Sequence, residues 1–295
     1  RTGGAQARFG EVYEAAFGPM IPKATLEEGL RQINSGPSLE TMIANNGGLN
    51  QQRIEGGMAA LCEALADDLG DVVRLGNPVT KVTHGDTAVV TLASGETVEA
   101  RTVVSTLPPR LAVALEYDPP LPQWRRDVAE KVAPGNVIKA YLVYETPFWR
   151  ERGLSGQSSS DEGAVRVTFD TTPVDSTHGL LMGFFEGNEA DSLAHRSLET
   201  RRRAFVESAV RAFGEEAAEP SEYVERDWSA EQYTRGCHGA HFAPGIWTSN
   251  GPVLAASDGC LYWAGAEYST KFNGYMEGAV RSGEEVAATI AVALI

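Results

Sequence analysis

The chain has 295 residues, of which 42% are hydrophobic and 22% are charged. This balance is typical of a folded globular protein and excludes a disordered chain. The 40 acidic and 25 basic residues give a formal net charge of -15, which argues against a nucleic-acid-binding surface and against docking on anionic lipid. We therefore expect neither a nucleic-acid partner nor a membrane.

Cysteine usage and the two ends of the sequence bear on location. The three cysteines, Cys62, Cys237 and Cys260, are too few and odd in number for a disulfide framework, which favours a reducing compartment. The apolar tail over residues 286–295 is about half as long as a membrane span. We expect a soluble, cytoplasmic protein. Because the sequence begins at Arg1 and not at Met, we also expect a processed product or a piece of a longer protein.

The first part of the chain predicts helices and one short strand. Residues 9–16, 25–33 and 58–69 have helical periodicity, and glycine pairs bracket a strand-like stretch over residues 51–55. Cys62 lies on the apolar stripe of the third helix, so we expect it to pack in the core.

Residues 72–107 alternate with period two, which predicts short strands in an antiparallel meander. The candidate strands cover residues 72–74, 79–82, 88–92, 97–99 and 101–107. Prolines between residues 119 and 122 mark a boundary before another helix.

A second strand-rich region follows, and a strand, a loop and a helix close the chain. The candidate strands cover residues 136–145, 164–170, 179–185, 222–227 and 259–265. Residues 198–213 predict a helix with Arg201, Arg202 and Arg203 on its solvated side, and the last helix begins near residue 275. Interleaved strands and helices predict an α/β or mixed α+β fold.

The closing segment, residues 261–284, is the most informative part of the sequence. A buried strand runs into a glycine, crosses a loop and enters a helix rich in small residues. Free N–H groups and the positive dipole end at the start of a helix suit an anionic ligand, and Gly274, Gly278 and Ala279 would let the backbone approach a flat ligand. Taken alone, the periodicity favours small residues that serve packing only.

This segment resembles the flavin-binding signature of the flavin-dependent amine oxidases, and most closely the monoamine oxidase branch. Earlier blocks resemble the family in order and spacing, namely residues 77–82, 103–109, 117–122, 135–139, 147–150 and 228–237. The similarity covers nearly everything from about residue 45 to about residue 290. It implies an incomplete FAD-binding domain of the amine oxidase type over residues 55–128 and 231–295. Residues 1–54 and 129–230 would form a substrate domain of mixed antiparallel sheet and helices.

One motif of the family is missing. The dinucleotide-binding half of these enzymes opens with Gly-x-Gly-x-x-Gly, whose glycines let the backbone meet pyrophosphate, and the 295 residues contain no such spacing. The resemblance therefore implies that a separate N-terminal chain carries this motif, or that the part that carries it was removed.

The resemblance assigns catalytic roles to residues of the second strand-rich region. Lys139 matches the lysine that holds a water against flavin N5, where its charge favours superoxide-like intermediates; taken alone, a lysine in a strand is more often at the surface. Cys237 matches the cysteine that forms a thioether to the flavin 8α-methyl group. Its alternatives are a buried small hydrophobe, or a metal ligand with His238 and His241, a set that lacks a fourth ligand. We expect no metal site.

Aromatic side chains of the family form a cage for the substrate amine. Trp228 and Tyr275 resemble the aromatic residues that flank the flavin, and Tyr275 would be one wall of the cage. The second wall would be His238, where the family usually has an aromatic residue, and a protonated imidazole would repel an ammonium group. Asn50 falls where the family often has a glutamine that lines the substrate cavity.

The remaining matches would bind the cofactor. Val79 would lie near the adenine and Thr106 near the isoalloxazine or its linker. Gly265 and Glu267 would lie near the pyrophosphate and ribityl chain, although a glutamate taken alone is more often at the surface. Gly274 lies in the same loop, and the backbone of Met276 would face the pyrimidine edge of the flavin.

Together these matches predict an FAD-dependent amine oxidase. The chain would oxidise an amine to an imine that is hydrolysed to a carbonyl compound, with oxygen reduced to hydrogen peroxide. One alternative is an amino-acid oxidase or a flavin desaturase, for which Arg166 is a weak candidate to bind a carboxylate. Another is a non-catalytic subunit or a remnant of such an enzyme. The predicted partners are a small-molecule amine, oxygen and the separate N-terminal chain, with an oligomer left open.

Overall fold

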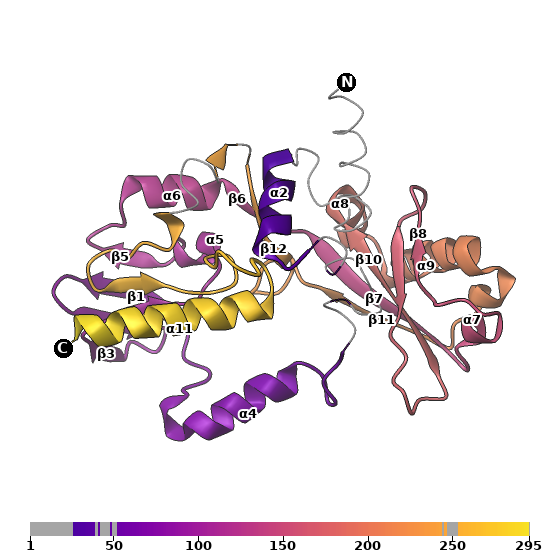
Figure 1. Cartoon of the computed structure of the whole chain (residues 1–295), viewed down its shortest axis with the longest axis horizontal. Coiled ribbons are helices and arrows are strands. Elements are labelled where there is room, and N and C mark those ends of the chain that lie inside the picture. Colours follow the sequence, from indigo (N-terminus) through magenta and orange to yellow (C-terminus); the bar gives the residue numbers. More distant parts are fainter. Residues whose placement is uncertain are drawn as a thin grey trace. The chain divides into compact units, whose positions relative to one another are not determined.

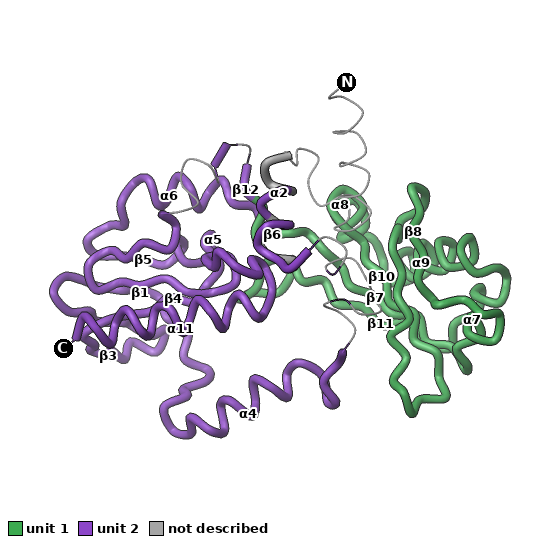
Figure 2. The backbone as a smooth tube through the Cα atoms, viewed as in Figure 1, with its two compact units in different colours: residues 1–26, 134–241 green, residues 27–133, 242–295 purple. Residues whose placement is uncertain are grey.

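The computed structural model describes residues 26–38, 41, 48, 52–243, 245–246 and 253–294. The chain forms two compact units (Figure 2), unit 1 from residues 1–26 and 134–241 and unit 2 from residues 27–133 and 242–295. The sequence predicts domain boundaries after residues 54, 128 and 230, between parts that bind flavin and parts that bind substrate. This domain assignment stays a prediction. The mixed α/β class is confirmed by the interleaved strands and helices of Figure 1.

Unit 1 is built on a five-stranded sheet in the order β11-β7-β10-β9-β8. The strands are β7 (Val137–Tyr144), β8 (Ser158–Ser159), β9 (Val167–Asp170), β10 (Gly179–Glu186) and β11 (Glu222–Asp227). All neighbours are antiparallel, and β7 pairs with β10 over its whole length, from Val137↔Glu186 to Tyr144↔Gly179. Alternation predicts strands over residues 136–145, 164–170, 179–185 and 222–227, and β7, β9, β10 and β11 confirm them, β9 being shorter than predicted. The short strand β8 was not predicted.

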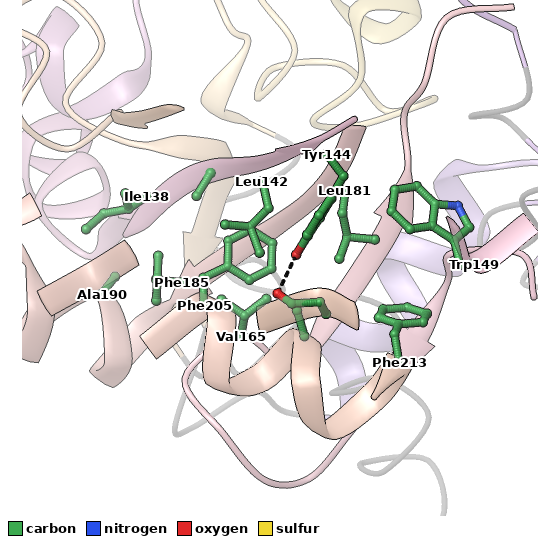
Figure 3. Close-up of a cluster of buried hydrophobic side chains, with 13 residues drawn as sticks. Ile138, Leu142, Tyr144, Trp149, Val165, Leu181, Phe185, Ala190, Phe205 and Phe213 are labelled. Atoms are coloured by element: carbon green, nitrogen blue, oxygen red, sulfur yellow. Dashed lines mark hydrogen bonds between the residues drawn. The ribbon is translucent and has the colours of Figure 1, made fainter. Parts of the chain in front are cut away.

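One face of this sheet packs on a helix to form the core of unit 1 (Figure 3). Helix α9 (Leu198–Phe213) begins at Ser197, whose hydroxyl accepts a hydrogen bond of 3.2 Å from the Thr200 N–H, the usual N-cap contact. The core side chains include Ile138, Leu142, Trp149, Leu181, Phe185, Phe205 and Phe213. The buried Tyr144 hydroxyl donates to the Ala217 carbonyl at 3.0 Å, which satisfies its polar atom.

The sequence predicts that Arg201, Arg202 and Arg203 lie on the solvated side of α9. This prediction is wrong for Arg201. The guanidinium of Arg201 donates two hydrogen bonds of 2.8 Å from its Nε to the Glu225 carboxylate, and the two side chains are only 13% and 10% exposed. This bidentate geometry stabilises the buried charge of Arg201. The local sequence does not reveal the pair, because Glu225 lies on β11, far along the chain from Arg201. The remaining helical elements of unit 1 are α7 (Phe148–Glu151), α8 (Gly187–Ala194) and η2 (Glu215–Ala218).

Unit 2 contains a four-stranded sheet in the order β3-β2-β1-β5. Its strands are β1 (Val79–His84), β2 (Ala88–Leu92), β3 (Thr97–Ala100) and β5 (Glu116–Asp118). The predicted antiparallel meander is confirmed for β1, β2 and β3, whereas β5 adds to β1 in parallel. The predicted strand over residues 72–74 is wrong, because the chain turns there through η1 (Gly70–Val72).

A second sheet of unit 2 is parallel and has two strands, β4 (Val103–Ser105) and β13 (Leu261–Trp263). Helix α11 (Met276–Ala293) follows β13 after a loop, as predicted. Two further helices, α5 (Pro109–Ala112) and α6 (Gln123–Glu130), connect β4 to β6 (Val132–Gly135), and β6 pairs with β12 (Cys237–Phe242).

The N-terminal predictions have mixed outcomes. The helices α2 (Leu26–Ser35) and α4 (Ala59–Leu69) are confirmed. The predicted strand is wrong over residues 52–55, which contain no strand, and the predicted helix over residues 9–16 lies outside the described residues. The prediction of core packing for Cys62 is wrong, because Cys62 is exposed and α4 contains no buried residue. The apolar stripe of α4 exists, but the described part of the chain does not cover it.

Glu186, at the end of β10, should make unit 1 less stable as the pH rises. The residue is 8% exposed, and burial raises the pKa of its carboxyl to about 7, opposed in part by the Arg166 charge. A pKa above the ordinary 4.5 means that its stabilisation is complete below pH 4.5 and is lost as the pH rises through 7. The loss is on the order of 3 kcal/mol by pH 8.

The variant Glu186→Gln should escape this loss. We expect the melting temperature of Glu186→Gln, relative to that of the wild type, to increase between pH 5 and pH 8. Glu199→Gln removes an exposed carboxylate on α9, and its melting temperature should change with pH as that of the wild type does. Thermal unfolding at several pH values measures this, and parallel profiles for Glu186→Gln and wild type would contradict the assignment.

Candidate functional site

Lys139 lies on the half-buried face of the unit 1 sheet, opposite to the core. Its ammonium is 5.6 Å from the ring centre of Tyr141 and 5.8 Å from that of Phe184. Phe184 pairs with Lys139 across the β7–β10 ladder, and Tyr141 lies two residues along β7, so all three share one face. Among the described residues Lys139 forms no ion pair. The two rings therefore stabilise a positive charge that no carboxylate neutralises.

Trp228 and Cys237 are joined by a short backbone connection next to the same sheet. Trp228 follows β11, and its N–H donates to the Val137 carbonyl at 3.2 Å. The Gly236 N–H donates to the Trp228 carbonyl at 2.9 Å, which closes the loop immediately before Cys237. A methyl group at Gly135 would overlap the Cys237 carbonyl, so β6 and β12 approach closely. The half-buried thiol of Cys237 is thereby held at a fixed position in unit 1.

The structure leaves the roles of two predicted substrate residues, His238 and Asn50, untested. His238 lies in β12, but the described residues do not include the position of its side chain, and Asn50 lies outside them.

Within the described ranges no three His, Cys, Asp or Glu side chains are grouped so that they could hold a metal ion. No helix in those ranges is long and apolar enough to cross a membrane.

In unit 2, Ser282 fastens α11 to the end of β13. The Gly265 N–H donates to the Ser282 Oγ at 2.8 Å, and the Ser282 hydroxyl is within 3.1 Å of the Gly265 carbonyl. Gly265 has a φ of +131°, and a methyl group there would lie 3.4 Å from the Thr106 carbonyl and 3.5 Å from Glu267 Oε2. Thr106, Gly265 and Glu267 are therefore neighbours in unit 2, and their contact with a flavin stays a prediction. The fourth cofactor candidate, Val79, begins β1 and is half-buried.

The loop between β13 and α11 is held by its own polar groups. The Asn273 side chain donates to the carbonyls of Glu267 at 3.1 Å and Ser269 at 2.8 Å, and its buried Oδ1 has no partner within the described part of the chain. The Gly274 N–H donates to the Ala266 carbonyl at 3.1 Å, and Gly274 has a φ of +79° that favours glycine. The loop is thus rigid, with one buried oxygen left unsatisfied.

Helix α11 begins with free N–H groups. Tyr275 is its N-cap residue, and no side chain caps the N–H groups that follow, the first of which belongs to Met276. Such groups carry a partial positive charge that stabilises an anion. Burial raises the pKa of the Glu267 carboxyl and also that of the Tyr275 hydroxyl.

Comparison with known proteins identifies the family. The sequence model of the flavin containing amine oxidoreductases matches residues 9–291. The chain belongs to this family. Relatives include AofH of Mycobacterium tuberculosis, whose name assigns it to the flavin-containing monoamine oxidases, at 38% identity over 265 residues. They also include dog amine oxidase B, at 36% over 253 residues.

The chain covers only part of these relatives. The matched residues are 90% of this chain and 58% of AofH, and 84% of this chain and 49% of dog amine oxidase B. The solved structure of putrescine oxidase bound to putrescine is similar with a TM-score of 0.91 at 31% identity, over 98% of this chain and 65% of that chain. Family membership confirms the resemblance seen in the sequence, and it implies a flavin cofactor.

The residues of unit 2 fit a flavin of this family. Two buried polar atoms, Ser105 Oγ and Asn273 Oδ1, have no partner among the described residues, and a ligand could satisfy them. Gly265 and Gly274 leave the backbone open to close approach, and the N-terminus of α11 offers N–H groups to a ligand with partial negative charge.

Several residues of this arrangement were not identified from the sequence. Tyr141 and Phe184 contact Lys139, and Ser282 and Gly278 are the only buried positions of α11. Alternation along β7 could have identified Tyr141, and the spacing of four residues between Gly278 and Ser282 is typical of one helical face. Phe184 could not be found in this way, because only the pairing of β10 with β7 brings it to Lys139.

Gly278→Ala should disrupt the loop between β13 and α11. A methyl group at Gly278 would overlap the Phe272 carbonyl and lie 3.0 Å from the Lys271 carbonyl, and both are backbone atoms. Because the loop cannot yield there without breaking its hydrogen bonds, we expect a loss of about 1–3 kcal/mol in stability and a lower flavin content.

Gly283→Ala is a matched control for this prediction. Gly283 lies on the same helix, and a methyl group there meets nothing within 4 Å. We expect it to be neutral or slightly stabilising, since alanine favours the helix. Thermal unfolding and the flavin absorbance per chain distinguish the two, and equal behaviour of both variants would contradict the prediction.

Proposed function

We propose that the complete protein catalyses FAD-dependent oxidation of an amine. An amine that carries a hydrogen on its α-carbon, oxygen and water would give a carbonyl compound, ammonia and hydrogen peroxide, by way of an imine that water hydrolyses. When bound, FAD would supply the electron acceptor for the amine and the electron donor for oxygen. The observation that carries the proposal is the ammonium of Lys139 over two aromatic rings, without an ion pair to any described residue, in a chain of a flavin-containing family.

The chain's own residues would orient the reactants. Tyr275 and His238 would be the walls of an amine cage, Trp228 would flank the flavin, and Asn50 would line the substrate side. Lys139 would hold a water and place its positive charge where oxygen is reduced. No side chain is required as a strong base, so the reactive form is the neutral amine, and turnover should rise with pH through the pKa of the bound amine.

Val79, Thr106, Gly265, Glu267, Gly274 and Met276 would bind FAD from unit 2. Their support is the closeness of Thr106, Gly265 and Glu267 and the uncapped start of α11. The chain would work with a separate N-terminal chain that carries the dinucleotide-binding motif. A cytoplasmic location completes the proposal.

An amino-acid oxidase is less well supported. It needs a free cation for the substrate carboxylate, and the candidate Arg166 has its guanidinium 3.8 Å from the Glu189 carboxylate and near the buried Glu186. A flavin desaturase shares the cofactor but not the need for an amine. Comparison of peroxide release from an amine and from the matching amino acid tests the choice, and turnover of the amino acid alone would reject our proposal.

A non-catalytic subunit is the alternative of a different class. The purified particle should show flavin absorbance and should consume oxygen when an amine is added. A particle without flavin bands, and without any partner chain on a denaturing gel, would support a non-catalytic remnant.

We further propose that Cys237 attaches FAD covalently: its sulfur would replace one hydrogen of the flavin 8α-methyl group, and the two hydrogens lost would pass to oxygen as hydrogen peroxide. The thiol is half-buried and held by the Trp228 connection, and a thioether would add the mass of the flavin to this chain. After denaturation, yellow colour and extra mass should stay with the wild-type chain and be lost from Cys237→Ser, while Cys260→Ser keeps them. Colour that leaves the wild-type chain would reject the covalent link but not the oxidase.

A further inference from the structure

The loop between β13 and α11 ends in an Asn–Gly turn. The turn covers residues 272–275, and the Tyr275 N–H donates to the Phe272 carbonyl at 2.9 Å. Gly274 has a φ of +79° there, a conformation that glycine adopts at little cost. Asn273, which precedes it, is 2% exposed and donates to two backbone carbonyls of the loop. The fold of this loop therefore depends on both residues of the pair.

Asn–Gly is also the pair of residues that deamidates fastest in peptides, because glycine has no side chain to hinder attack by its own nitrogen. In this chain the Gly274 nitrogen would bond to Asn273 Cγ and lose its proton to solvent base, and the Cγ–Nδ2 bond would break to release ammonia. Water would then open the resulting succinimide ring to aspartate or isoaspartate. The net reaction consumes water and releases ammonia, and it needs no oxidant or reductant.

The closed loop opposes this reaction. The Asn273 Nδ2 donates to the carbonyls of Glu267 at 3.1 Å and Ser269 at 2.8 Å, which holds the leaving amide in place. The attacking nitrogen is also engaged, since the Gly274 N–H donates to the Ala266 carbonyl at 3.1 Å. Burial of Asn273 keeps away the solvent base that must remove the proton. Reaction therefore requires the loop to open by local unfolding.

The product cannot restore the closed loop. Hydrolysis replaces the Asn273 amide, which donates hydrogen bonds, by a carboxylate, which only accepts them. This carboxylate would face the Glu267 and Ser269 carbonyls, so three acceptors would meet without a donor. Isoaspartate also adds a carbon atom to the backbone before Gly274, which moves the Gly274 N–H away from the Ala266 carbonyl. Reaction in the open loop is thus irreversible.

We propose that Asn273 is a deamidation site that the closed loop protects, so that each chain whose loop opens for long enough is permanently modified there. The site lies in the segment that joins the parallel strand β13 to α11, and its chemistry needs neither an amine nor oxygen. The proposal therefore goes beyond amine oxidation and does not depend on it.

The test is the rate of modification at each Asn–Gly pair of the purified full chain, followed by peptide mass spectrometry and enzymatic labelling of isoaspartate. The sequence contains two further pairs, Asn46–Gly47 and Asn250–Gly251, which serve as internal standards. In urea we expect all three pairs to react at similar rates. In native buffer Asn273 should react about 10²-fold more slowly than in urea, the protection expected from three hydrogen bonds of ordinary strength.

Two glycine variants of α11 test whether the loop gives this protection. Gly278→Ala, whose methyl group would overlap the Phe272 carbonyl, should raise the native rate at Asn273 about tenfold and leave the rate in urea unchanged. Gly283→Ala is the matched control, because its methyl group meets nothing within 4 Å. Its rates should equal those of the wild type.

Two variants within the loop extend the test. Ser269→Ala keeps the carbonyl that Asn273 binds but removes the hydroxyl, which donates to the Lys271 carbonyl at 2.6 Å, so it should also raise the native rate. If Gly278→Ala does not fold, Ser269→Ala decides. Asn273→Asp copies one product and should melt at a lower temperature than the wild type, whereas an unchanged melting temperature would contradict irreversibility.

Several results would overturn the proposal. They are equal rates at Asn273 in native buffer and urea, no increase in the native rate in the folded loop variants, and reaction of the two standards in urea without reaction of Asn273. A chain that deamidates as expected but does not oxidise amines would contradict only the proposed function, because the readout here is mass and not turnover.

Discussion

Lys139→Met should slow the reaction with oxygen about 10²-fold, the typical effect of removing one preorganised electrostatic group from an active site. The ammonium lies over Tyr141 and Phe184 and has no carboxylate partner among the described residues, so its full charge is available to stabilise negative charge on oxygen. Methionine has a similar length and no charge, and it can pack on the same rings. The change therefore removes the electrostatic effect and keeps the fold.

The measurement separates the two halves of the reaction. We expect kcat/KM for oxygen to fall and the rate of anaerobic flavin bleaching by the amine to change much less. Lys139→Arg keeps a positive charge and should recover part of the oxygen rate. Arg226→Met changes the residue that pairs with Lys139 on β11, where the side chain is 65% exposed, and should leave both rates unchanged. An unaltered oxygen dependence in Lys139→Met would contradict the role of its charge.

Arg125→Leu should destabilise unit 2 by about 2–4 kcal/mol, because it leaves two carbonyl groups without their donor. The guanidinium is 2% exposed and donates to the Leu254 carbonyl at 2.8 Å and to the Ala256 carbonyl at 2.5 Å. It also lies over the rings of Trp124 at 4.7 Å and Trp263 at 4.4 Å, which adds a cation–π contribution.

Thermal or denaturant unfolding measures this loss. The pKa of Arg125 is lowered by burial, against which the charges of Tyr268 and Asp258 act. The stability of Arg125→Lys should lie between that of Arg125→Leu and that of the wild type, since a single ammonium cannot reach both carbonyls in the same planar geometry. Arg126→Leu, next to it and bonded only to Gln123 in an exposed position, should change stability by less than about 0.5 kcal/mol. Equal losses in both leucine variants would show that the Arg125 contacts contribute nothing.

The local sequence pattern was enough to predict those helices and strands that bury one face. The bounds of α9 and β11 were predicted from periodicity, and the meander of β1 to β3 from alternation and turn residues. The same reasoning failed for residues 72–74, because Gly70, with a φ of +61°, allows the chain to turn just before them. It also failed for Cys62, because an apolar helical stripe predicts burial only when something covers it.

The candidate site depended on a different kind of information. Resemblance to the amine oxidases selected Lys139 and Gly265, but it could not reveal that Phe184 supports the first and Ser282 the second. These contacts join residues that are far apart in sequence, and they arise from strand pairing and helix docking. The parallel addition of β5 to β1 was missed for the same reason, since the crossover leaves no local signal.

The parallel pair β4–β13 has a consequence for biosynthesis. Val103 and Leu261 lie roughly 160 residues apart, so β4 leaves the ribosome about 10–30 s before its neighbour at ordinary rates of translation. Residues 134–241 of unit 1 lie between the two strands in sequence, so the sheet of unit 1 is synthesised before β13. The β4–β13 pair of unit 2 must therefore form late, and the edge of β4 stays open to aggregation until then.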